Sequence, residues 1–208
     1  MTALSTRIDE EMKSYEQIVE ESQQLTGNVT KQDFQMLSVI GKGAYGKVLL
    51  VKKKDAADGE LYAMKVLKKS EILRRNQVEH TMTERRILGS VRHPFIVKMD
   101  YAFQSETKLF FVLEYCPGGE LFFYLSQIGR FKEDAARFYA SNILLALEHL
   151  HSLDILYRDL KPENVLVGKD GYAKLTDFGL AKENVAGNSD AKSLCGTAEY
   201  LSPEILMR

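Results

Sequence analysis

Two short apolar segments, Val165–Val167 and Ala173–Thr176, flank a polar turn that runs from Gly168 to Gly171. Apolar runs of this length around a glycine-containing turn predict a β-hairpin. A hairpin returns its ends to the same place, so polar residues just outside it are expected to converge at one rim. Those residues are Asp159, Asn164 and Asp177. Carboxylate and amide oxygens suit Mg²⁺, and Lys161 adds a cation where a transferring phosphate would lie.

The first half of the chain predicts mainly strands, because short β-branched and aromatic runs alternate with turn residues. The expected strands are Phe34–Ile40, Lys47–Val51, Leu61–Lys65, Phe95–Tyr101 and Leu109–Glu114. One helix is expected from Ser70 to Val91, and His93-Pro94 stops it.

The second half predicts helices, beginning with a short one at Glu120–Gln127. An apolar stripe with a period of about 3.6 residues follows and predicts a buried core helix to which we assign no chemistry. The stripe consists of Ala136, Tyr139, Ala140, Ile143, Leu144, Leu147 and Leu150.

Before these elements, residues 7–25 carry apolar side chains at helical spacing among many acids, and Gly27-Asn28 ends the run. This pattern predicts an acidic amphipathic helix outside the catalytic unit. It is either a solvated extension that packs loosely on the domain or an autoinhibitory or partner-binding helix.

Composition narrows the class of protein. The chain has 208 residues, 45% of them hydrophobic, and a formal charge of −1, which allows a substantial core and argues against nucleic acid as a partner. Cys116 and Cys195 lie far apart without metal-ligand spacing, so reduced thiols are expected. The sequence contains no secretory signal and no apolar run long enough for a membrane span. We therefore expect a soluble cytoplasmic protein, with access to the nucleus left open.

A glycine-rich segment, Gly41-Lys42-Gly43-Ala44-Tyr45-Gly46, follows the first expected strand. Its G-x-G-x-x-G pattern is weak evidence alone, because dinucleotide-binding folds also use it. Those folds need a helix after the last glycine, whereas Val48–Val51 is apolar and β-branched. The segment therefore predicts a strand-loop-strand whose glycines let the backbone lie close over phosphates.

Lys65 ends an expected strand, and the next expected helix contains an acidic residue with which it can pair. His80, Glu84 and Leu88 fall on one helix face. We expect Glu84 to pair with Lys65; the alternative is a solvated Glu on a charged helix.

The stretch Tyr157–Asn164, followed by Asp177-Phe178-Gly179, matches the catalytic loop and metal loop of protein kinases. Tyr157 stands where the general signature has His, and Ser202-Pro203-Glu204 stands where it has Ala-Pro-Glu. The Tyr form is usual in the group that includes protein kinases A, B and C, the AGC group. The chain resembles this serine/threonine kinase group from Phe34 to its last residue.

The resemblance implies an α+β, two-lobed protein-kinase-like fold. A small antiparallel β lobe with one helix would cover residues 34–115, and an incomplete, mainly helical large lobe would cover 116–208. Residues 1–33 would be the acidic helical extension. Helices that complete the large lobe and the tail typical of the group do not appear before Arg208, so we expect a truncated kinase domain. Its final segment, Ser193–Arg208, should be less well supported, and the isolated chain marginally stable with little activity.

The resemblance also implies ATP and Mg²⁺ as cofactors and a role for each site residue. Asp159 would accept the proton of the substrate hydroxyl, and Lys161 would neutralise the γ-phosphate. Lys65, held by Glu84, would bind the α- and β-phosphates, and Asn164 with Asp177 would hold two Mg²⁺ ions. Leu113 would guard the back of the adenine pocket. The nucleotide-binding positions are Ile40, Gly41, Lys42, Gly43, Ala44, Tyr45, Gly46, Lys47, Val48, Ala63, Lys65, Glu114, Cys116, Glu120, Leu166 and Asp177.

Partners follow from the same resemblance. Ser/Thr acceptors in protein substrates are implied by the sequence Asp-Leu-Lys-Pro-Glu-Asn. Thr197 implies the same acceptors and would support Asp159 and Lys161. Glu120 and Glu163 would receive arginines upstream of the acceptor. Ser193 would be phosphorylated by an upstream kinase, or it is an unmodified loop serine. The cations expected to dock that phosphate are His80, Arg158 and Lys182.

Two classes of function remain open from the sequence. One is an ATP-dependent Ser/Thr protein kinase given as a fragment. The other is a non-catalytic chain, such as a pseudokinase-like nucleotide binder or a dominant-negative regulator of this length. Every catalytic position is filled, which disfavours a pseudokinase.

Overall fold

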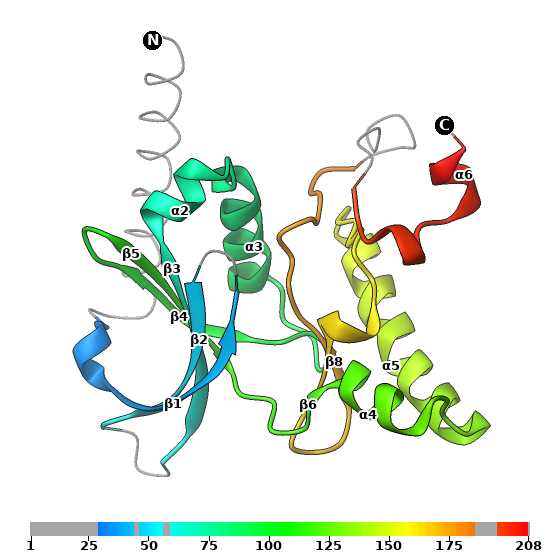
Figure 1. Ribbon diagram of the computed structural model, residues 1–208, viewed down its shortest axis with the longest axis horizontal. Coiled ribbons are helices and arrows are strands. Elements are labelled where there is room, and N and C mark those ends of the chain that lie inside the picture. The colour runs from blue at the N-terminus through cyan, green and yellow to red at the C-terminus, as the bar shows by residue number, and fades with distance from the viewer. Residues whose placement is uncertain (1–28, 44–45, 56–58, 186–194, 208) are drawn as a thin grey trace, which may run out of the picture. The chain divides into compact units, whose positions relative to one another are not determined.

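The computed structural model describes residues 29–43, 46–55, 59–185 and 195–207 (Figure 1). The expected acidic helix at 7–25 lies outside the described residues, as do Ala44, Tyr45 and Ser193. The chain divides into two compact units. Unit 1 comprises Met1–Arg85 and Met99–Tyr115, and unit 2 comprises Arg86–Lys98 and Cys116–Arg208.

Unit 1 contains a five-stranded antiparallel sheet with the order β1-β2-β3-β5-β4 (Figure 1). The strands are β1 (Phe34–Lys42), β2 (Gly46–Lys53), β3 (Leu61–Lys68), β4 (Met99–Gln104) and β5 (Lys108–Glu114). Successive side chains of a strand point to opposite faces. Tyr62, Met64 and Val66 of β3 are therefore buried on one face, and Lys65 belongs to the other.

One buried cluster of unit 1, made of aromatic and aliphatic side chains, lies on that first face. Phe103 stacks on Phe110 with ring centroids 4.9 Å apart, and Phe34 stacks on Phe103 at 6.0 Å. The buried members are Phe34, Leu49, Val51, Tyr62, Met64, Val66, Phe103, Phe110 and Val112. Phe34 opens β1, and the partly buried side chain of Val29, which precedes β1 in the sequence, also packs against this cluster.

The single helix expected at Ser70–Val91 is wrong, because the structure has α2 (Lys69–Arg74) and α3 (Val78–Ser90). Asn76 lies between them with φ of 53°, a left-handed conformation that ends a helix and that Asn tolerates better than most residues. The amide of Asn76 bonds to the carbonyl of Leu73, which closes α2. Neither Gly nor Pro marks the break in the sequence, so the sequence did not reveal it.

Two expected strands also differ from the observed ones. The strand β3 continues to Lys68 instead of ending at Lys65, and β4 begins only at Met99. Residues before β4 pair elsewhere: the Val97 amide donates to the Leu175 carbonyl, and the Leu175 amide donates to the Phe95 carbonyl. The apolar run at 95–101 is thus divided: Phe95 and Val97 bond to Leu175 of β8, and β4 begins at Met99.

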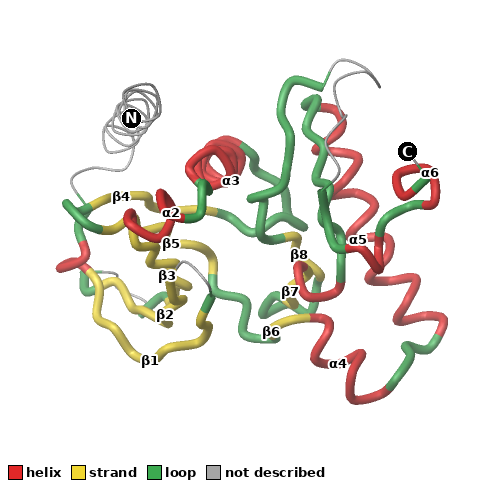
Figure 2. Tube along the Cα trace, turned by 45° about the horizontal axis from the view of Figure 1, so that its top comes forward, coloured by secondary structure: helices red, strands yellow, loops and turns green. Residues whose placement is uncertain are grey.

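Unit 2 contains the predicted hairpin, which is confirmed. Strands β7 (Val165–Val167) and β8 (Ala173–Leu175) pair antiparallel, and β6 (Gly119–Glu120) adds to β7. Figure 2 shows these strands beside α4. The helices are α4 (Leu121–Ile128), α5 (Glu133–Ser152) and α6 (Pro203–Leu206), with single 3₁₀ turns η2 (Pro162–Asn164) and η3 (Ala198–Tyr200). A further turn, η1 (Lys31–Asp33), precedes β1 in unit 1.

The prediction that α5 is a buried core helix is only partly right. Its buried residues are Asn142, Ala146 and Leu150, whereas Leu144 is 66% exposed. The helix contacts β8 through one face, and apolar residues occur on more than that face. Periodicity identified the helix and the buried Leu150, but it missed Asn142 and Ala146 and included the exposed Leu144.

The architecture belongs to the α+β class, as predicted, with one unit built mainly of strands and one mainly of helices. Within the described residues, no helix is sufficiently long and apolar to cross a membrane.

Candidate active site

The loop between α5 and the hairpin of unit 2 carries the predicted catalytic residues. It is fixed to the segment after Asp177 by two backbone hydrogen bonds, since Leu156 and Lys182 each donate to the other's carbonyl at 2.8 Å. Arg158 adds a side-chain bond from Nε to the Leu180 carbonyl at 2.7 Å. Arg158 has φ of 63°, a conformation that persists only where surrounding contacts hold it.

Asp159 accepts hydrogen bonds from three side chains, and its own side chain is only 10% exposed. Oδ1 accepts from Thr197 Oγ1 at 2.8 Å. Oδ2 accepts from Asn164 Nδ2 at 2.8 Å and forms an ion pair with Lys161 Nζ at 3.0 Å. A carboxylate offers about four lone-pair sites, so three donors leave room for one more. That open position lies on Oδ1, where a substrate hydroxyl can donate.

The pKa of Asp159 is lowered from its ordinary value. Burial raises the pKa, but the hydrogen bond from Thr197, the bond and charge of Lys161 and the bond from Asn164 together outweigh it. Asp159 is therefore ionised at neutral pH and acts as an acceptor.

Thr197 reaches Asp159 because Gly196 lets two chain segments approach closely. Gly196 has φ of 111°, and a Cβ at this position would lie 2.8 Å from the Arg158 carbonyl oxygen. Thr197 Oγ1 also accepts from Lys161 Nζ at 2.8 Å. Asp159, Lys161 and Thr197 thus form a closed ring of hydrogen bonds, in line with the support for Asp159 and Lys161 that the family resemblance implies for Thr197.

Asn164 and Asp177 have donor atoms suited to Mg²⁺. Asn164 Nδ2 donates to both the carbonyl and Oδ2 of Asp159, which leaves Oδ1 as the free acceptor of that amide within the described chain. No group of three or more His, Cys, Asp and Glu residues that could hold a metal occurs among the described residues. Mg²⁺ typically takes one or two protein oxygens and completes its shell with phosphates and water, so this donor set fits it.

The position of Asp177 is fixed from both sides. Before it, the Thr176 amide donates to the Asn164 carbonyl at 3.0 Å, and the Tyr157 hydroxyl donates to the Thr176 carbonyl. After it, Phe178 is fully buried and meets the Tyr157 ring edge to face at 5.1 Å. In the sequence, Tyr157 is only a departure from the general pattern, and nothing there indicates its contact with Phe178.

In unit 1, the predicted ion pair between Lys65 and Glu84 is present. Lys65 Nζ lies 2.6 Å from Glu84 Oε1 and 2.7 Å from Oε2, and the Glu84 side chain is 6% exposed. Breaking such a buried pair leaves an uncompensated charge, which is strongly destabilising. Glu84 is therefore not the solvated helix residue of the alternative interpretation.

The predicted nucleotide-binding residues divide between the units. Those of unit 1 that are described lie on β1, β2, β3 and the end of β5, except Gly43, which follows β1 in the loop: Ile40, Gly41, Lys42, Gly43, Gly46, Lys47, Val48, Ala63, Lys65 and Glu114. Those of unit 2 are Cys116, Glu120, Leu166 and Asp177. Leu113 is buried and pairs with Ala63 across β5 and β3. The strand-loop-strand expected around the glycines is confirmed, because β1 and β2 pair antiparallel.

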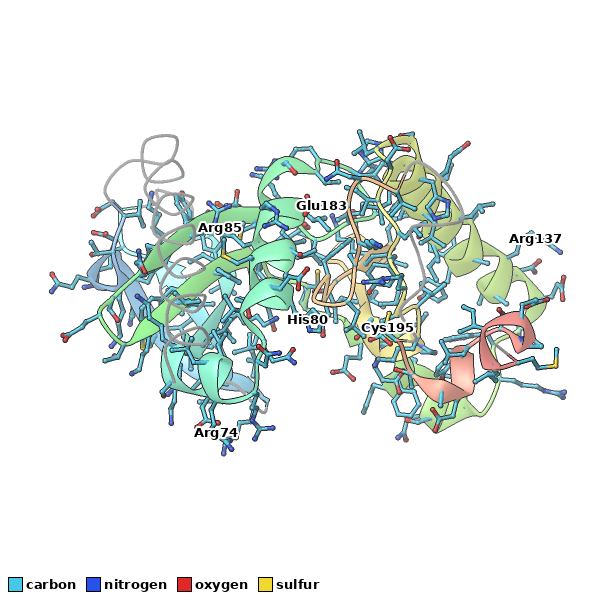
Figure 3. All side chains as sticks on the ribbon, turned by 90° about the horizontal axis from the view of Figure 1, so that it is seen from above. Arg74, His80, Arg85, Arg137, Glu183 and Cys195 are labelled. Carbon is cyan, nitrogen blue, oxygen red and sulfur yellow. The ribbon has the colours of Figure 1, made fainter. Side chains whose placement is uncertain are left out.

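The predicted phosphate-docking residues also divide between the units. Arg158 and Lys182 belong to segments of unit 2 that bond to each other, whereas His80 lies on α3 in unit 1, where Nδ1 is 2.8 Å from Gln77 Oε1. Sequence analysis missed the neighbouring ion pair between Arg86 Nη2 and Glu183 Oε2 at 2.8 Å (Glu183 is labelled in Figure 3). Its partners are distant in sequence, and no local pattern could have revealed it.

The two predicted substrate-binding carboxylates lie in unit 2. Glu120 ends β6, pairs with Leu166 and is the N-cap of α4, and Glu163 lies in η2, which contacts both α4 and β6. Glu163 Oε2 is buried and has no hydrogen-bond partner within the described residues. A buried carboxylate oxygen without a partner is costly, so this atom suits a cationic ligand.

Comparison with known proteins agrees with this geometry. Residues 34–208 match the family model of the protein kinase domain. The chain is 52% identical over 178 residues to mouse and human RAC-beta serine/threonine-protein kinases, covering 86% of this chain and 37% of theirs. It is also 52% identical over 175 residues to a RAC family serine/threonine-protein kinase homolog of Dictyostelium discoideum, covering 84% of this chain and 39% of that protein.

The chain thus spans well under half the length of these relatives, which are AGC-group kinases. The family match includes the catalytic loop, the loop at Asp177 and the paired Lys65 and Glu84. The chain belongs to the protein kinase domain family, and within it the chain is similar to the RAC serine/threonine kinases of the AGC group.

Proposed function

We propose that the protein containing this chain transfers the γ-phosphoryl group of ATP to Ser or Thr hydroxyls of protein substrates. The observation that carries the proposal is Asp159, an ionised carboxylate with three donors and one open lone-pair site among the described residues. A hydroxyl that donates to this site is oriented for attack and has an acceptor for its proton. Family membership and similarity to serine/threonine kinases support the choice of acceptor.

The remaining residues bind and orient the reactants. Lys65, held by Glu84, would bind the α- and β-phosphates, and Lys161 would neutralise charge on the transferring phosphate. Asn164 Oδ1 and the Asp177 carboxylate would hold Mg²⁺, which when bound neutralises charge on the phosphate oxygens. The ring of Asp159, Lys161 and Thr197 keeps the base and the cation at fixed separation.

The test is Asp159→Asn in the complete protein. Turnover should fall by about 10²–10⁴-fold, the range for loss of a general base, while calorimetry shows ATP binding unchanged. The matched control is Asp154→Asn, which removes a charge from the same segment at a position with φ of 56° that Asn also tolerates. Phosphate incorporation into a serine peptide by the Asp159→Asn variant at close to the parent rate would contradict the role of Asp159.

We propose further that substrates carry basic residues upstream of the acceptor. Oε2 of Glu163, which is buried and without a partner in the described part of the chain, supports this, since an arginine would satisfy it. A peptide panel should show a higher kcat/KM with upstream Arg, and Glu163→Gln should reduce that preference. An equal preference in parent and variant would argue against Glu163.

Regulation by an upstream kinase acting on Ser193 completes the proposal. A phosphate group carries a charge of about −1.5 to −2 and needs cations to bind it. Arg158 and Lys182, whose segments are hydrogen-bonded to each other, would supply these cations together with His80. Ser193→Ala should therefore lower the activity of the complete protein and abolish the rise in activity that phosphorylating extracts produce. Full activity in that variant would show that Ser193 is an unmodified loop serine.

A further inference from the structure

In unit 2, β8 is an edge strand of the three-stranded sheet, and its outer edge faces away from β7. The Gly168 amide bonds to the Tyr172 carbonyl, and the Thr176 amide bonds to the Asn164 carbonyl. Even-numbered residues here therefore direct their backbone groups toward β7 and the loop before it. By the alternation of an antiparallel ladder, Ala173 and Leu175 direct theirs away.

Each outward amide of β8 meets a different partner. The Leu175 amide donates to the Phe95 carbonyl at 2.8 Å. The Ala173 amide donates at 3.0 Å to Oδ1 of Asn142, a side chain on α5. Asn142 is 3% exposed and lies on the same buried helix face as Ala146 and Leu150. It is a polar group on an otherwise apolar contact face, and its acceptor replaces the strand that β8 lacks at this point.

We propose that Asn142 is a positioning residue for the metal-binding carboxylate Asp177. Asp177 follows directly on Thr176, with φ of 58°, and a non-glycine residue in this region needs firm support on both sides. Phe178 supplies that support after Asp177, and β8 supplies it before. Asn142 holds the start of β8 against α5, so it fixes the strand whose end sets where Asp177 lies. The consequence for metal binding rests on the proposed function; the consequence for the strand does not.

The test uses Asn142→Leu in the complete protein, because leucine has a similar size and no acceptor. The Ala173 amide should exchange with solvent about tenfold faster once its hydrogen bond is lost. The Thr176 amide, next to Asp177, should exchange faster as well, because the whole strand shifts. Asn142→Asp retains an oxygen acceptor of the same length and should keep parent-like exchange at both amides.

Activity provides the second readout. The Mg²⁺ concentration that gives half-maximal turnover should rise about tenfold in Asn142→Leu, the lower end of effects seen when a group supporting a metal ligand is removed, while the KM for peptide stays constant. Ala140→Gly is the control for lost helix stability, since glycine inside a helix costs about 1 kcal/mol and Ala140 lies on an exposed part of α5, away from the face that carries Asn142. Its Mg²⁺ dependence should equal that of the parent.

Two results would overturn the inference. One is faster exchange at Ala173 with parent-like exchange at Thr176, because the bond would then be purely local. The other is an unchanged Mg²⁺ dependence in a folded Asn142→Leu protein. Absence of any phosphoryl transfer in the parent would refute the proposed function instead, and the two amide exchange rates would still decide whether Asn142 positions the strand.

Discussion

Thr197 illustrates how one residue organises the site. Its hydroxyl donates to Asp159 Oδ1 and accepts from Lys161 Nζ, both at 2.8 Å. It therefore fixes the acid and the cation relative to each other and also lowers the pKa of Asp159. A group whose pKa is lowered by folding contributes stability that is present above its unfolded pKa. That contribution is lost as the pH falls through the folded pKa.

Thr197→Val removes the hydroxyl and keeps the shape of the side chain. We expect turnover to fall about 10- to 100-fold, since hydrogen bonds to charged groups are worth about 1.5–3 kcal/mol. The pKa of Asp159 should rise, so the acidic limb of the kcat/KM profile should move to higher pH. Thr197→Ser should restore both. A Thr197→Val variant with a parent pH profile would show that Thr197 does not influence Asp159.

At the scale of elements, the pairing of β2 with β3 depends on one glycine. Gly46 opposes Leu67 at the start of β2. A Cβ on Gly46 would lie 1.8 Å from the Val66 carbonyl oxygen, a distance that no side chain can adopt without moving the backbone. Gly43, in the same glycine-rich segment, has no atom of the described residues within 4 Å of its Cβ position. The two glycines therefore serve different purposes, and only Gly46 is required for the sheet.

Gly46→Ala should destabilise the protein by about 1–3 kcal/mol, the usual cost of overpacking. Gly43→Ala, the matched control, should change stability by no more than about 0.5 kcal/mol. Urea unfolding followed by circular dichroism measures both. Equal midpoints for the two variants would mean that β2 and β3 tolerate the extra methyl group.

At the scale of the whole molecule, unit 2 carries several large apolar side chains on its surface. Phe123 and Ile128 on α4 are 60% and 57% exposed, and Leu144 and Leu145 on α5 are 66% and 45% exposed. By contrast, Arg137, also on α5, is ion-paired to Glu133 and projects outward (Figure 3). Exposed apolar groups of this size favour association with other surfaces.

The isolated 208-residue polypeptide should therefore self-associate as its concentration rises. Leu144→Lys should reduce this association, because it removes exposed apolar area and adds a charge. Lysine is a good helix former, so α5 should be retained. Glu148→Gln is the control, since it changes net charge in the same direction on an exposed part of α5 without removing apolar area. Light scattering at several concentrations checks this. A monodisperse parent chain would contradict the prediction.

Local features of the chain were predictable from the sequence. The hairpin of β7 and β8 and the strand-loop-strand at the glycines follow from short apolar runs and the turns between them. The pairing of Lys65 with Glu84 followed from one helix face and from the family pattern. These features depend on residues close in sequence or on a motif of fixed spacing, so the pattern carries the information.

Other features required tertiary contacts. The sequence could not locate the break at Asn76, because neither Gly nor Pro marks it, and could not divide residues 95–101 between two structures, because they form one mostly apolar run. It identified the helix α5 and the buried Leu150 but not Asn142 and Ala146, since the buried face is selected by contact with β8. The bond from Asn142 to Ala173 and the ion pair of Arg86 with Glu183 join distant residues, and only the folded chain brings them together. The sequence by itself determined which groups are available for the chemistry, and the tertiary structure decided which of them meet, because hydrogen bonds and packing act over a few ångströms in space and not along the chain.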